Sequence, residues 1–456
     1  MSAPAPSIAA IILAAGKGTR MKSATPKVLH AVAGVPMVGH VVARALELGA
    51  APIAIVTAPG MDAVVTVARD IAGDVDVAIQ KDQLGTAHAV LAARPVLGEL
   101  EGHLLILYGD TPLLTTATLA RVLDALDADP KCGVAVLGFI PDEAGDYGRL
   151  VEAEDGTLER IVEAKEASED ELAIPLCNSG VMAIRGSIAW ELLTKVDNKN
   201  AKGEYYLTDI VALAATLGYF GIAVEGDADE VLGVNSRSEL AVAEAIFQYR
   251  ARKMHMDAGV TLIDPDSVFF AADTIIGSDV IIEPSVFFGP GVTIASGAHI
   301  KAFSHIEGAT IGANTSVGPF ARLRPGATLG ADVRVGNFVE IKQSDVADGA
   351  KISHLSYIGD ASIGASANIG AGTITCNYDG YLKYKTTIGR DVFIGSNSAL
   401  IAPVTIHDGA MVAAGSTITE DVEKDALAMT RGPQESKPQW AKEFRARKAD
   451  EKRKKK

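Results

Sequence analysis

The sequence predicts two domains, a Rossmann-like, doubly wound α/β domain followed by a parallel β-helix. A chain of 456 residues is too long for one ordinary core. Short apolar runs alternate with helical stretches up to about residue 230, and a six-residue apolar period takes over after about residue 270. We place the first domain at residues 1–236, a connecting helix at 237–260, and the β-helix with a basic C-terminal arm at 261–456.

The apolar runs of the first domain are near-continuous and rich in β-branched residues or leucine, which is typical of parallel strands buried on both faces. The runs are Ile8–Ala15, Pro52–Ala58, Val75–Ile79, His103–Tyr108 and Cys132–Phe139. Candidate helices lie between them, at Met37–Leu48, Ala87–Leu97 and Thr115–Leu126. Strands that alternate with helices predict a doubly wound sheet that binds ligands beyond the carboxyl ends of its strands.

The second half carries apolar anchors six residues apart, with a few resets of the count. The series are 276 to 306, 311 to 341, 346 to 358, 363 to 369 and 388 to 418. A period of six fits neither a helix face at 3.6 residues nor a strand at 2, and it predicts hexapeptide sides of a β-helix. The interruption at residues 370–387 carries Asn377, Tyr378 and Lys383. Insertions in repeat proteins often lie on the binding face, although a harmless insertion is the alternative.

Composition excludes several classes of function. A net charge of -15 argues against a general nucleic-acid-binding protein, which needs cations to neutralise phosphates. Three cysteines without metal-ligand spacing favour a reducing, cytoplasmic compartment. The apolar run at Ile8–Ala15 is too short to cross a membrane, so we expect no membrane association. The basic run from Lys442 to Lys456 is interpreted as a solvated helix end or tail.

A glycine-containing loop follows the first strand and is a candidate phosphate site. Gly16 and Gly18 would let backbone N–H groups approach a phosphate, and Arg20 and Lys27 would neutralise its charge. The loop is neither a Walker A motif nor a dinucleotide fingerprint, because Met21 replaces the third glycine. By itself the pattern is also compatible with a plain tight turn.

A second candidate lies at the end of the strand His103–Tyr108, where Asp110 follows Gly109. A carboxylate at the carboxyl end of a strand is suitably placed for Mg²⁺, which takes one or two protein oxygens in addition to substrate phosphates. The alternative is that Asp110 only caps a following helix.

Six short motifs of the first domain occur in a characteristic order. They are Leu13–Met21, Gln83–Ala87, Tyr108–Asp110, Tyr147–Arg149, Ile161–Lys165 and Gly233–Asn235. They resemble those of the sugar-1-phosphate nucleotidyltransferases. Together with the β-helix, they resemble the bifunctional N-acetylglucosamine-1-phosphate uridyltransferase/glucosamine-1-phosphate acetyltransferase family over nearly the whole chain. Ser179, where threonine is expected, and Ala87, where glycine is common, are conservative departures.

The resemblance implies that the first domain transfers a uridylyl group from UTP to N-acetylglucosamine-1-phosphate and releases pyrophosphate. The implied nucleotide and sugar contacts are Leu13, Ala14, Gly16, Lys27, Gln80, Gly85, Thr86, Tyr108, Asp110, Gly148, Glu163, Asn178 and Asn235. Asp110 and Asn235 would bind Mg²⁺. The attacking phosphate oxygen is already an anion, so catalysis would rest on charge neutralisation by Mg²⁺, Arg20 and Lys27 and on positioning.

The resemblance also implies a left-handed β-helix that transfers an acetyl group from acetyl-CoA to glucosamine-1-phosphate. His354 is the best candidate base, although a lone histidine on a solenoid is usually a surface residue. The implied sugar-phosphate contacts are Arg324, Lys342, Tyr357, Asn368 and Lys383. The implied acetyl-CoA contacts are Asn377, Tyr378, Ser396, Ala414 and Arg431. The resemblance further implies a homotrimer with active sites between subunits.

Two other interpretations remain at this stage. The β-helix could be a mere oligomerisation or regulatory module beside an active nucleotidyltransferase. The whole chain could also be a scaffold with a degenerate nucleotide fold, which the presence of Lys27, Asp110 and Asn235 disfavours. A dehydrogenase is excluded by the missing third glycine.

Overall fold

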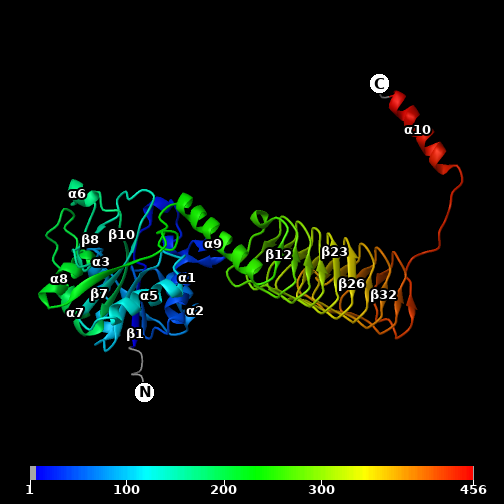
Figure 1. Ribbon diagram of the computed structural model, residues 1–456. Coiled ribbons are helices and arrows are strands. Elements are labelled where there is room, and N and C mark those ends of the chain that lie inside the picture. Colours follow the sequence, from blue (N-terminus) through cyan, green and yellow to red (C-terminus); the bar gives the residue numbers. More distant parts are fainter. Residues whose placement is uncertain (1–6, 455–456) are drawn as a thin grey trace, which may run out of the picture. The chain divides into compact units, whose positions relative to one another are not determined.

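The computed structural model describes residues 7–454, which form two compact units (Figure 1). The first unit comprises the chain up to Lys253 together with Phe270–Ala272, and the second comprises Met254–Phe269 and the chain from Asp273. The predicted connecting helix is α9, Arg237–Asp257, and the division between the units falls inside it. Lys455 and Lys456 of the predicted basic run lie outside the described residues. None of the helices within 7–454 is both long and apolar enough to cross a membrane.

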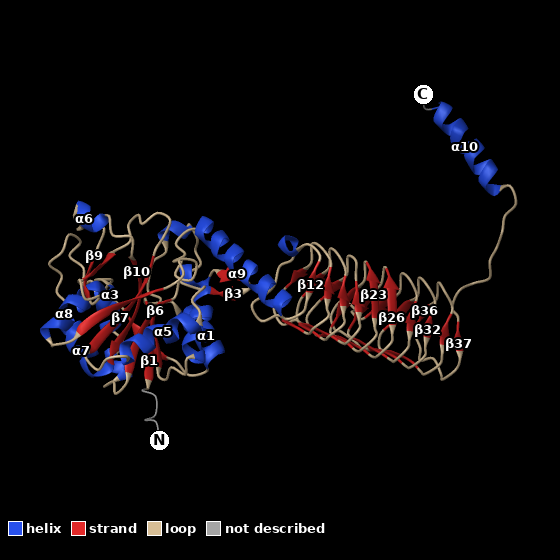
Figure 2. Ribbon diagram, viewed as in Figure 1, coloured by secondary structure: helices blue, strands red, loops and turns tan. Residues whose placement is uncertain are grey.

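A nine-stranded sheet forms the centre of the first unit, in the order β5-β4-β1-β6-β10-β7-β11-β9-β8. Figure 2 shows its strands in red with helices in blue around them. The strands are β1 (Ile8–Leu13), β4 (Ile53–Thr57), β5 (Asp76–Ile79), β6 (His103–Tyr108), β7 (Cys132–Phe139), β8 (Arg149–Glu152), β9 (Leu158–Val162), β10 (Cys177–Arg185) and β11 (Phe220–Glu225). All five predicted strands are present. The sheet is mixed rather than wholly parallel, because β10 runs antiparallel to both β6 and β7. Strand β10 lies between two predicted strands and was missed.

Helices pack on the sheet of the first unit and bury two apolar layers. They are α1 (Met37–Glu47), α2 (Asp62–Ala72), α3 (Thr86–Leu91), α4 (Arg94–Leu97), α5 (Thr116–Asp127), α6 (Glu169–Leu172), α7 (Gly186–Lys195) and α8 (Ile210–Thr216). The small hairpin β2 (Ala31–Val32) and β3 (Val35–Pro36) precedes α1. The single helix expected at Ala87–Leu97 is two helices, because Pro95 occupies the start of a second one.

The second unit is a β-helix of three parallel sheets, as the six-residue period predicts. The β12 sheet contains β12 (Thr261–Leu262), β14 (Ile281–Ile282), β17 (His299–Ile300), β20 (Ser316–Val317), β23 (Arg334–Asn337), β26 (Lys351–His354), β29 (Asn368–Ile369), β32 (Phe393–Ile394), β35 (Met411–Val412) and β37 (Leu427–Ala428). The β13 sheet contains β13 (Ile275–Ile276), β16 (Thr293–Ile294), β19 (Ala309–Ile311), β22 (Ala327–Leu329), β25 (Ser344–Val346), β28 (Ala361–Ile363), β31 (Thr386–Ile388) and β34 (Val404–Ile406). The β15 sheet contains β15 (Phe287–Phe288), β18 (His305–Ile306), β21 (Arg322–Leu323), β24 (Glu340–Lys342), β27 (Tyr357–Gly359), β30 (Ile374–Cys376), β33 (Ala399–Ile401) and β36 (Thr417–Ile418). Helix α10 (Trp440–Lys454) follows the solenoid.

The anchors pair with one another from coil to coil. Ile282 lies opposite Ile300, and Ile300 lies opposite Val317, all with their side chains buried. Each coil therefore buries its anchors against its neighbours and adds to a continuous apolar column.

The interruption of the repeat is shorter than the residues 370–387 expected from sequence. Thr375 is fully buried in β30, six residues after Ile369, and it continues the series of anchors. The backbone N–H of Gly359 donates to the Thr375 hydroxyl at 2.8 Å, and that hydroxyl lies 3.1 Å from the Gly359 carbonyl oxygen. A threonine can occupy the core because its hydroxyl is satisfied there. The extra loop therefore runs from Asn377 to about Lys385, closed by a bridge between Tyr378 and Lys383.

Candidate functional site

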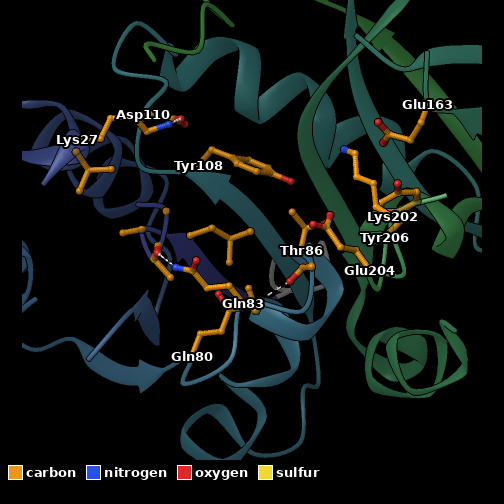
Figure 3. Close-up of a pocket in the computed structure, with 17 residues that line it drawn as sticks. Lys27, Gln80, Gln83, Thr86, Tyr108, Asp110, Glu163, Lys202, Glu204 and Tyr206 are labelled. Atoms are coloured by element: carbon orange, nitrogen blue, oxygen red, sulfur yellow. Dashed lines mark hydrogen bonds and ion pairs between the residues drawn. The ribbon is translucent and has the colours of Figure 1, made fainter. Parts of the chain in front are cut away.

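The first unit contains a cavity of about 460 Å³ at the carboxyl ends of β1 and β6 (Figure 3). This is where a doubly wound sheet is expected to bind ligands. The cavity is lined by Leu13, Ala14, Ala15, Gly16, Lys27, Val28, Gln80, Gln83, Gly85, Thr86, Ala89, Tyr108, Asp110, Glu163, Lys202, Glu204 and Tyr206.

One end of the cavity is a cluster of one cation and two oxygen ligands. The Lys27 ammonium forms an ion pair with Asp110 and donates to Asn235 Oδ1 at 2.9 Å. The backbone fixes both oxygen-bearing residues, since the N–H of Val234 donates to the carbonyl oxygen of Asp110 at 2.9 Å. The side chains of Lys27 and Asp110 are only 12% and 18% exposed, so their attraction is screened little by water. The pair of oxygens is thus a site that holds a cation close to the glycine loop.

The loop between β5 and α3 forms the wall of the cavity. The Gln83 amide donates to the Ala15 carbonyl oxygen at 2.6 Å, and the Gln80 amide donates to the Gly85 carbonyl oxygen at 3.1 Å. Gly85 has φ of 122°, and a side chain there would collide with the backbone of Tyr205. Only glycine allows this close approach, which brings the loop after α7 against the cavity.

The far end of the cavity carries half-buried acidic and phenolic groups. Burial, together with the charges of Asp110 and Glu163, raises the pKa of Tyr108, so its hydroxyl remains a donor at neutral pH. Burial raises the pKa of Glu163, and the Lys202 ammonium partly opposes that shift. Such an end offers hydrogen bonds to a polar, hydroxyl-bearing ligand.

The second unit has a separate open hollow of about 440 Å³ on the β12 sheet. It is lined by Lys301, Ser316, Gly318, Pro319, Arg334, Val335, Gly336, Asn337, Ser353 and His354. His354 ends β26 with an exposed side chain, as its place two residues after the buried anchor Ile352 predicts. Its Nδ1 lies 2.7 Å from Asn337 Oδ1.

His354 belongs to a column of corner residues between the β12 and β15 sheets, which we call the corner column. The corner column consists of Asn337, His354, Ala371, Ser396 and Ala414, one on each successive coil. Backbone hydrogen bonds of 2.7–3.2 Å join successive coils at this corner. For example, the N–H of Leu355, the residue that follows His354 in the chain, donates to the carbonyl oxygen of Asn337 on the preceding coil. Arg431 donates to the Ala414 carbonyl oxygen at 3.1 Å at the end of the column. The small side chains beyond His354 leave room along this corner.

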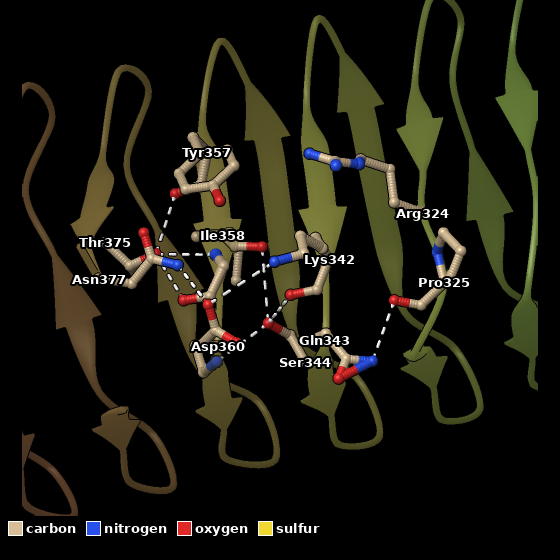
Figure 4. A network of polar contacts seen from close by, with 12 residues as sticks. Arg324, Pro325, Lys342, Gln343, Ser344, Tyr357, Ile358, Asp360, Thr375 and Asn377 are labelled. Atoms are coloured by element: carbon tan, nitrogen blue, oxygen red, sulfur yellow. Dashed lines mark hydrogen bonds and ion pairs between the residues drawn. The ribbon is translucent and has the colours of Figure 1, made fainter. Parts of the chain in front are cut away.

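A cation cluster lies at the other edge of the β15 sheet and consists of Arg324, Lys342 and Lys383. Figure 4 shows two of its members, Arg324 and Lys342. Arg324 pairs with Glu340 at 2.8 Å, and Lys342 lies 4.0 Å from Asp360. The Lys342 ammonium lowers the pKa of Lys383, which places the two like charges side by side. Like charges held together in this way favour an anionic ligand such as a phosphate.

The comparisons with known proteins decide the family. A MobA-like NTP transferase domain model matches residues 10–182, and a model of bacterial transferase hexapeptides (six repeats) matches residues 308–343 and 385–420. The chain is 54% identical over 448 residues to the bifunctional protein GlmU of Paramagnetospirillum magneticum, covering 98% of this chain and 99% of that protein. It is 57% identical to the bifunctional protein GlmU of Maricaulis maris and 56% identical to that of Rhodospirillum rubrum, over 96% of this chain and 96–97% of each relative.

The chain belongs to the GlmU family of bifunctional enzymes. The family, the fold class and the pair of activities predicted from the sequence, uridylyl transfer and acetyl transfer, are thereby confirmed. The interpretations of the β-helix as a mere oligomerisation module and of the chain as a scaffold are set aside.

Within this GlmU-family chain, most of the predicted nucleotide-site residues line the first cavity. Arg20, Gly148, Asn178 and Asn235 are not among its lining residues. Asn235 contacts the lining residue Lys27, and Gly148 accepts a hydrogen bond from the N–H of Asn178 at 2.8 Å. Arg20 is exposed on the short 3₁₀ helix that follows the glycine loop.

Sequence reasoning missed several lining residues. Gln83 lay within a recognised motif, but no role was given to it, and Lys202, Glu204 and Tyr206 lie in a loop that the sequence analysis did not single out. The available signal was a long polar stretch after α7 that contains two tyrosines at 205 and 206. Binding residues lie disproportionately on loops, so such a stretch was a candidate for one wall of the site.

The β-helix residues divide between the two edges of the β15 sheet. Ser396, Ala414 and Arg431 lie with His354 along the corner column, and Asn368 begins β29 in the adjoining β12 sheet. Asn377, which is expected among the acetyl-CoA contacts, donates to Asp360 beside the cation cluster. Tyr378 is exposed in the inserted loop.

Replacing Asp209 with asparagine should make the thermal stability of the protein depend less on pH. Burial and the negative charges of Asp197, Glu166 and Glu163 raise the pKa of Asp209 to about 6. The folded protein then keeps a proton that the unfolded chain releases between about pH 4 and pH 6, so Asp209 makes stability fall as pH rises through this window. Thermal melts of Asp209→Asn should show a smaller loss of Tm across that window and a higher Tm at pH 7. An unchanged Tm profile would contradict this.

Proposed function

We propose that UTP and N-acetylglucosamine-1-phosphate bind in the cavity of the first unit, with Mg²⁺ held by Asp110 and Asn235. The observation that supports the metal is that these two oxygens already share one cation, the Lys27 ammonium. Within residues 7–454, no group of three His, Cys, Asp or Glu side chains could complete a metal site. A carboxylate and an amide suit Mg²⁺, which takes its remaining ligands from water and phosphates and supplies charge neutralisation.

In this proposal, the chain's own residues bind, orient and neutralise charge. Leu13, Ala14, Gly16 and the loop of Gln80, Gly85 and Thr86 hold the uridine nucleotide, and Lys27 and Arg20 face its phosphates. Glu163, Gly148, Asn178 and Tyr108 hold the N-acetyl sugar. The sugar-1-phosphate oxygen attacks the α-phosphorus in line and pyrophosphate leaves, so no general base is needed. Positioning and neutralisation lower the barrier.

We propose that His354 is the general base of acetyl transfer. Its imidazole takes a proton from the 2-ammonium group of glucosamine-1-phosphate, and the freed amine forms a C–N bond with the acetyl carbon. The C–S bond breaks, and the departing sulfur takes the second proton of the former amine, so that CoA leaves as a thiol. Acetyl-CoA would lie along the small residues of the corner column, with Ser396, Ala414 and Arg431 as contacts and with the Asn377–Tyr378 loop of a neighbouring copy of the chain beside it.

The cation cluster supplies the site for the sugar phosphate, together with Tyr357 and Asn368. The cation cluster and His354 lie at opposite edges of the β15 sheet of the same chain. A second copy of the chain is therefore needed to bring a cation cluster to each His354. We propose a homotrimer with acetyl-transfer sites between subunits. Its subunit contact would include three stacked phenylalanines, Phe303, Phe320 and Phe338, which we call the aromatic ladder.

The aromatic ladder consists of Phe303, Phe320 and Phe338 on successive coils. Their rings stack with centroids 4.9 and 5.2 Å apart, and each is about half exposed. All three have φ between 54° and 60°, a conformation that costs a bulky residue roughly 1–2 kcal/mol. Exposed apolar residues kept at strained positions are typical of an interaction surface.

Phe320→Asp should reduce the assembly to smaller species and with it the release of CoA thiol, because a charge would be buried in the subunit contact. Light scattering coupled to size exclusion measures the mass. Thr310→Asp, on the exposed face of the β13 sheet, is the matched control and should remain trimeric. A trimeric Phe320→Asp would remove the aromatic ladder from the proposed interface.

The two reactions would run in series, because the product of acetyl transfer is the acceptor for uridylyl transfer. The observation that carries the proposed function is that the chain has two separate sites. The cavity with Lys27 and Asp110 lies in the first unit, and the hollow with His354 lies in the second. The test supplies each substrate pair alone. N-acetylglucosamine-1-phosphate, UTP and Mg²⁺ should release pyrophosphate, and glucosamine-1-phosphate with acetyl-CoA should release thiol. A pair that does not react would refute the site assigned to it.

We also propose that the enzyme works in the cytoplasm. All three cysteines are free thiols, two of them buried, which suits a reducing compartment.

A further inference from the structure

We propose that Asn337 is a positioning residue for His354, which it orients and holds in the tautomer that leaves Nε2 free to accept a proton. This inference rests on the proposed role of His354 as the base of acetyl transfer. It concerns a residue to which neither the sequence nor the family resemblance assigned a role.

The contact between the two side chains is direct and short. Nδ1 of His354 lies 2.7 Å from Oδ1 of Asn337. The residues lie opposite one another in the register of β23 and β26, one coil apart. Asn337 is half-buried, so its amide is less free to turn away than a surface side chain would be.

The backbone on both sides of the contact is held as well. The N–H of Leu355 donates to the Asn337 carbonyl oxygen at 3.0 Å, and the N–H of Gly372 donates to the His354 carbonyl oxygen at 3.2 Å. The Ser356 hydroxyl donates to the same carbonyl oxygen of His354 at 2.8 Å. The imidazole therefore stands on a fixed backbone, and Asn337 fixes the remaining rotation of its ring.

The chemistry of the two groups determines the tautomer. An amide oxygen can only accept a hydrogen bond, so Nδ1 of His354 must carry the hydrogen. The neutral imidazole then has its lone pair on Nε2, which is the form that a base needs. The hydrogen bond from Nδ1 to Asn337 remains after Nε2 is protonated. The neutral amide oxygen therefore stabilises the imidazolium, although it carries no full negative charge.

The charged groups around the hollow explain why an amide is suitable here. Lys301 and Arg334 line it together with His354. A carboxylate in place of the amide would add a negative charge that these cations attract. The amide thus orients the ring without adding a charge to the hollow.

The test compares Asn337→Ala and Asn337→Asp with the unaltered chain in thiol-release assays over a range of pH. Asn337→Ala should lower kcat by about 10- to 100-fold with little change in KM, because the ring is no longer held in place. Asn337→Asp should keep most of kcat at alkaline pH and move the acid limb of kcat/KM up by about one pH unit, because a carboxylate raises the pKa of the histidine.

Asn314→Asp adds the same charge on another corner of the solenoid and should leave the profile unchanged. Uridylyl transfer measured on the same samples reports whether each variant is folded. An Asn337→Ala protein with the kcat and the pH profile of the unaltered chain would overturn the inference. If His354→Ala still releases thiol normally, the assignment of His354 as base fails first, and the role of Asn337 fails with it.

Discussion

Asp110→Ala is expected to lower the rate of uridylyl transfer by about 10³-fold or more and to leave acetyl transfer intact. Asp110 supplies the only carboxylate of the proposed metal site and also holds the Lys27 ammonium. Its loss removes a metal ligand and frees Lys27 from its position beside the phosphates. Pyrophosphate release from UTP and N-acetylglucosamine-1-phosphate measures the first activity, and thiol release measures the second.

Asp110→Asn keeps the shape of the side chain and separates loss of charge from loss of packing. It should remain strongly impaired, since an amide is a poorer ligand for Mg²⁺ than a carboxylate. Asp70→Ala, on the exposed side of α2, is the control for removing one negative charge from the same unit. Near-normal uridylyl transfer by a folded Asp110→Ala protein would contradict the proposed metal site.

His354→Ala should have the converse effect and lower acetyl transfer by about 10²- to 10⁴-fold while sparing uridylyl transfer. The amine of the substrate is protonated at neutral pH, so no attack on the thioester can occur until a base takes the proton. The side chain is exposed, so its removal should change Tm little. Thiol release with glucosamine-1-phosphate and acetyl-CoA gives the rate.

A matched histidine is available on the same β-helix. His407 is exposed outside the corner column, and His407→Ala should keep full acetyl transfer. Because the two sites are separate, each of these variants should lose only one of the two activities. If either Asp110→Ala or His354→Ala removed both activities from a folded protein, the two sites could not be independent.

The parts of the fold with strong periodicity could be predicted from the sequence. The buried strands β6 and β7 have the bounds expected for them, and the six-residue anchors mark the coils of the β-helix. Strand β10 was missed because its pairing partners β6 and β7 are distant in sequence, and a local pattern does not reveal such pairing. Thr375 was not recognised as an anchor because the other anchors are apolar and threonine is polar. Its hydroxyl is satisfied by Gly359 on another coil, which the sequence alone does not show.

The candidate sites follow the same division. Lys27, Asp110 and Asn235 carry recognisable motifs, and the structure brings them together across more than 200 residues. Lys202 and Tyr206 come from a loop whose place at the cavity depends on the close approach at Gly85. The contact between Asn337 and His354 depends on how β23 and β26 pair on successive coils. The positions of the anchors predict the coils, but they do not show which side chains at the corners meet.

One incubation tests the central claim, two sites that act in series on one chain. The purified protein would receive glucosamine-1-phosphate, acetyl-CoA, UTP and Mg²⁺ together, with free thiol and pyrophosphate followed separately. The account predicts that thiol appears first, that pyrophosphate follows after a lag, and that pyrophosphate is absent when acetyl-CoA is left out. Pyrophosphate released without a lag and without acetyl-CoA would contradict the series. So would a protein that forms pyrophosphate from N-acetylglucosamine-1-phosphate but never releases thiol.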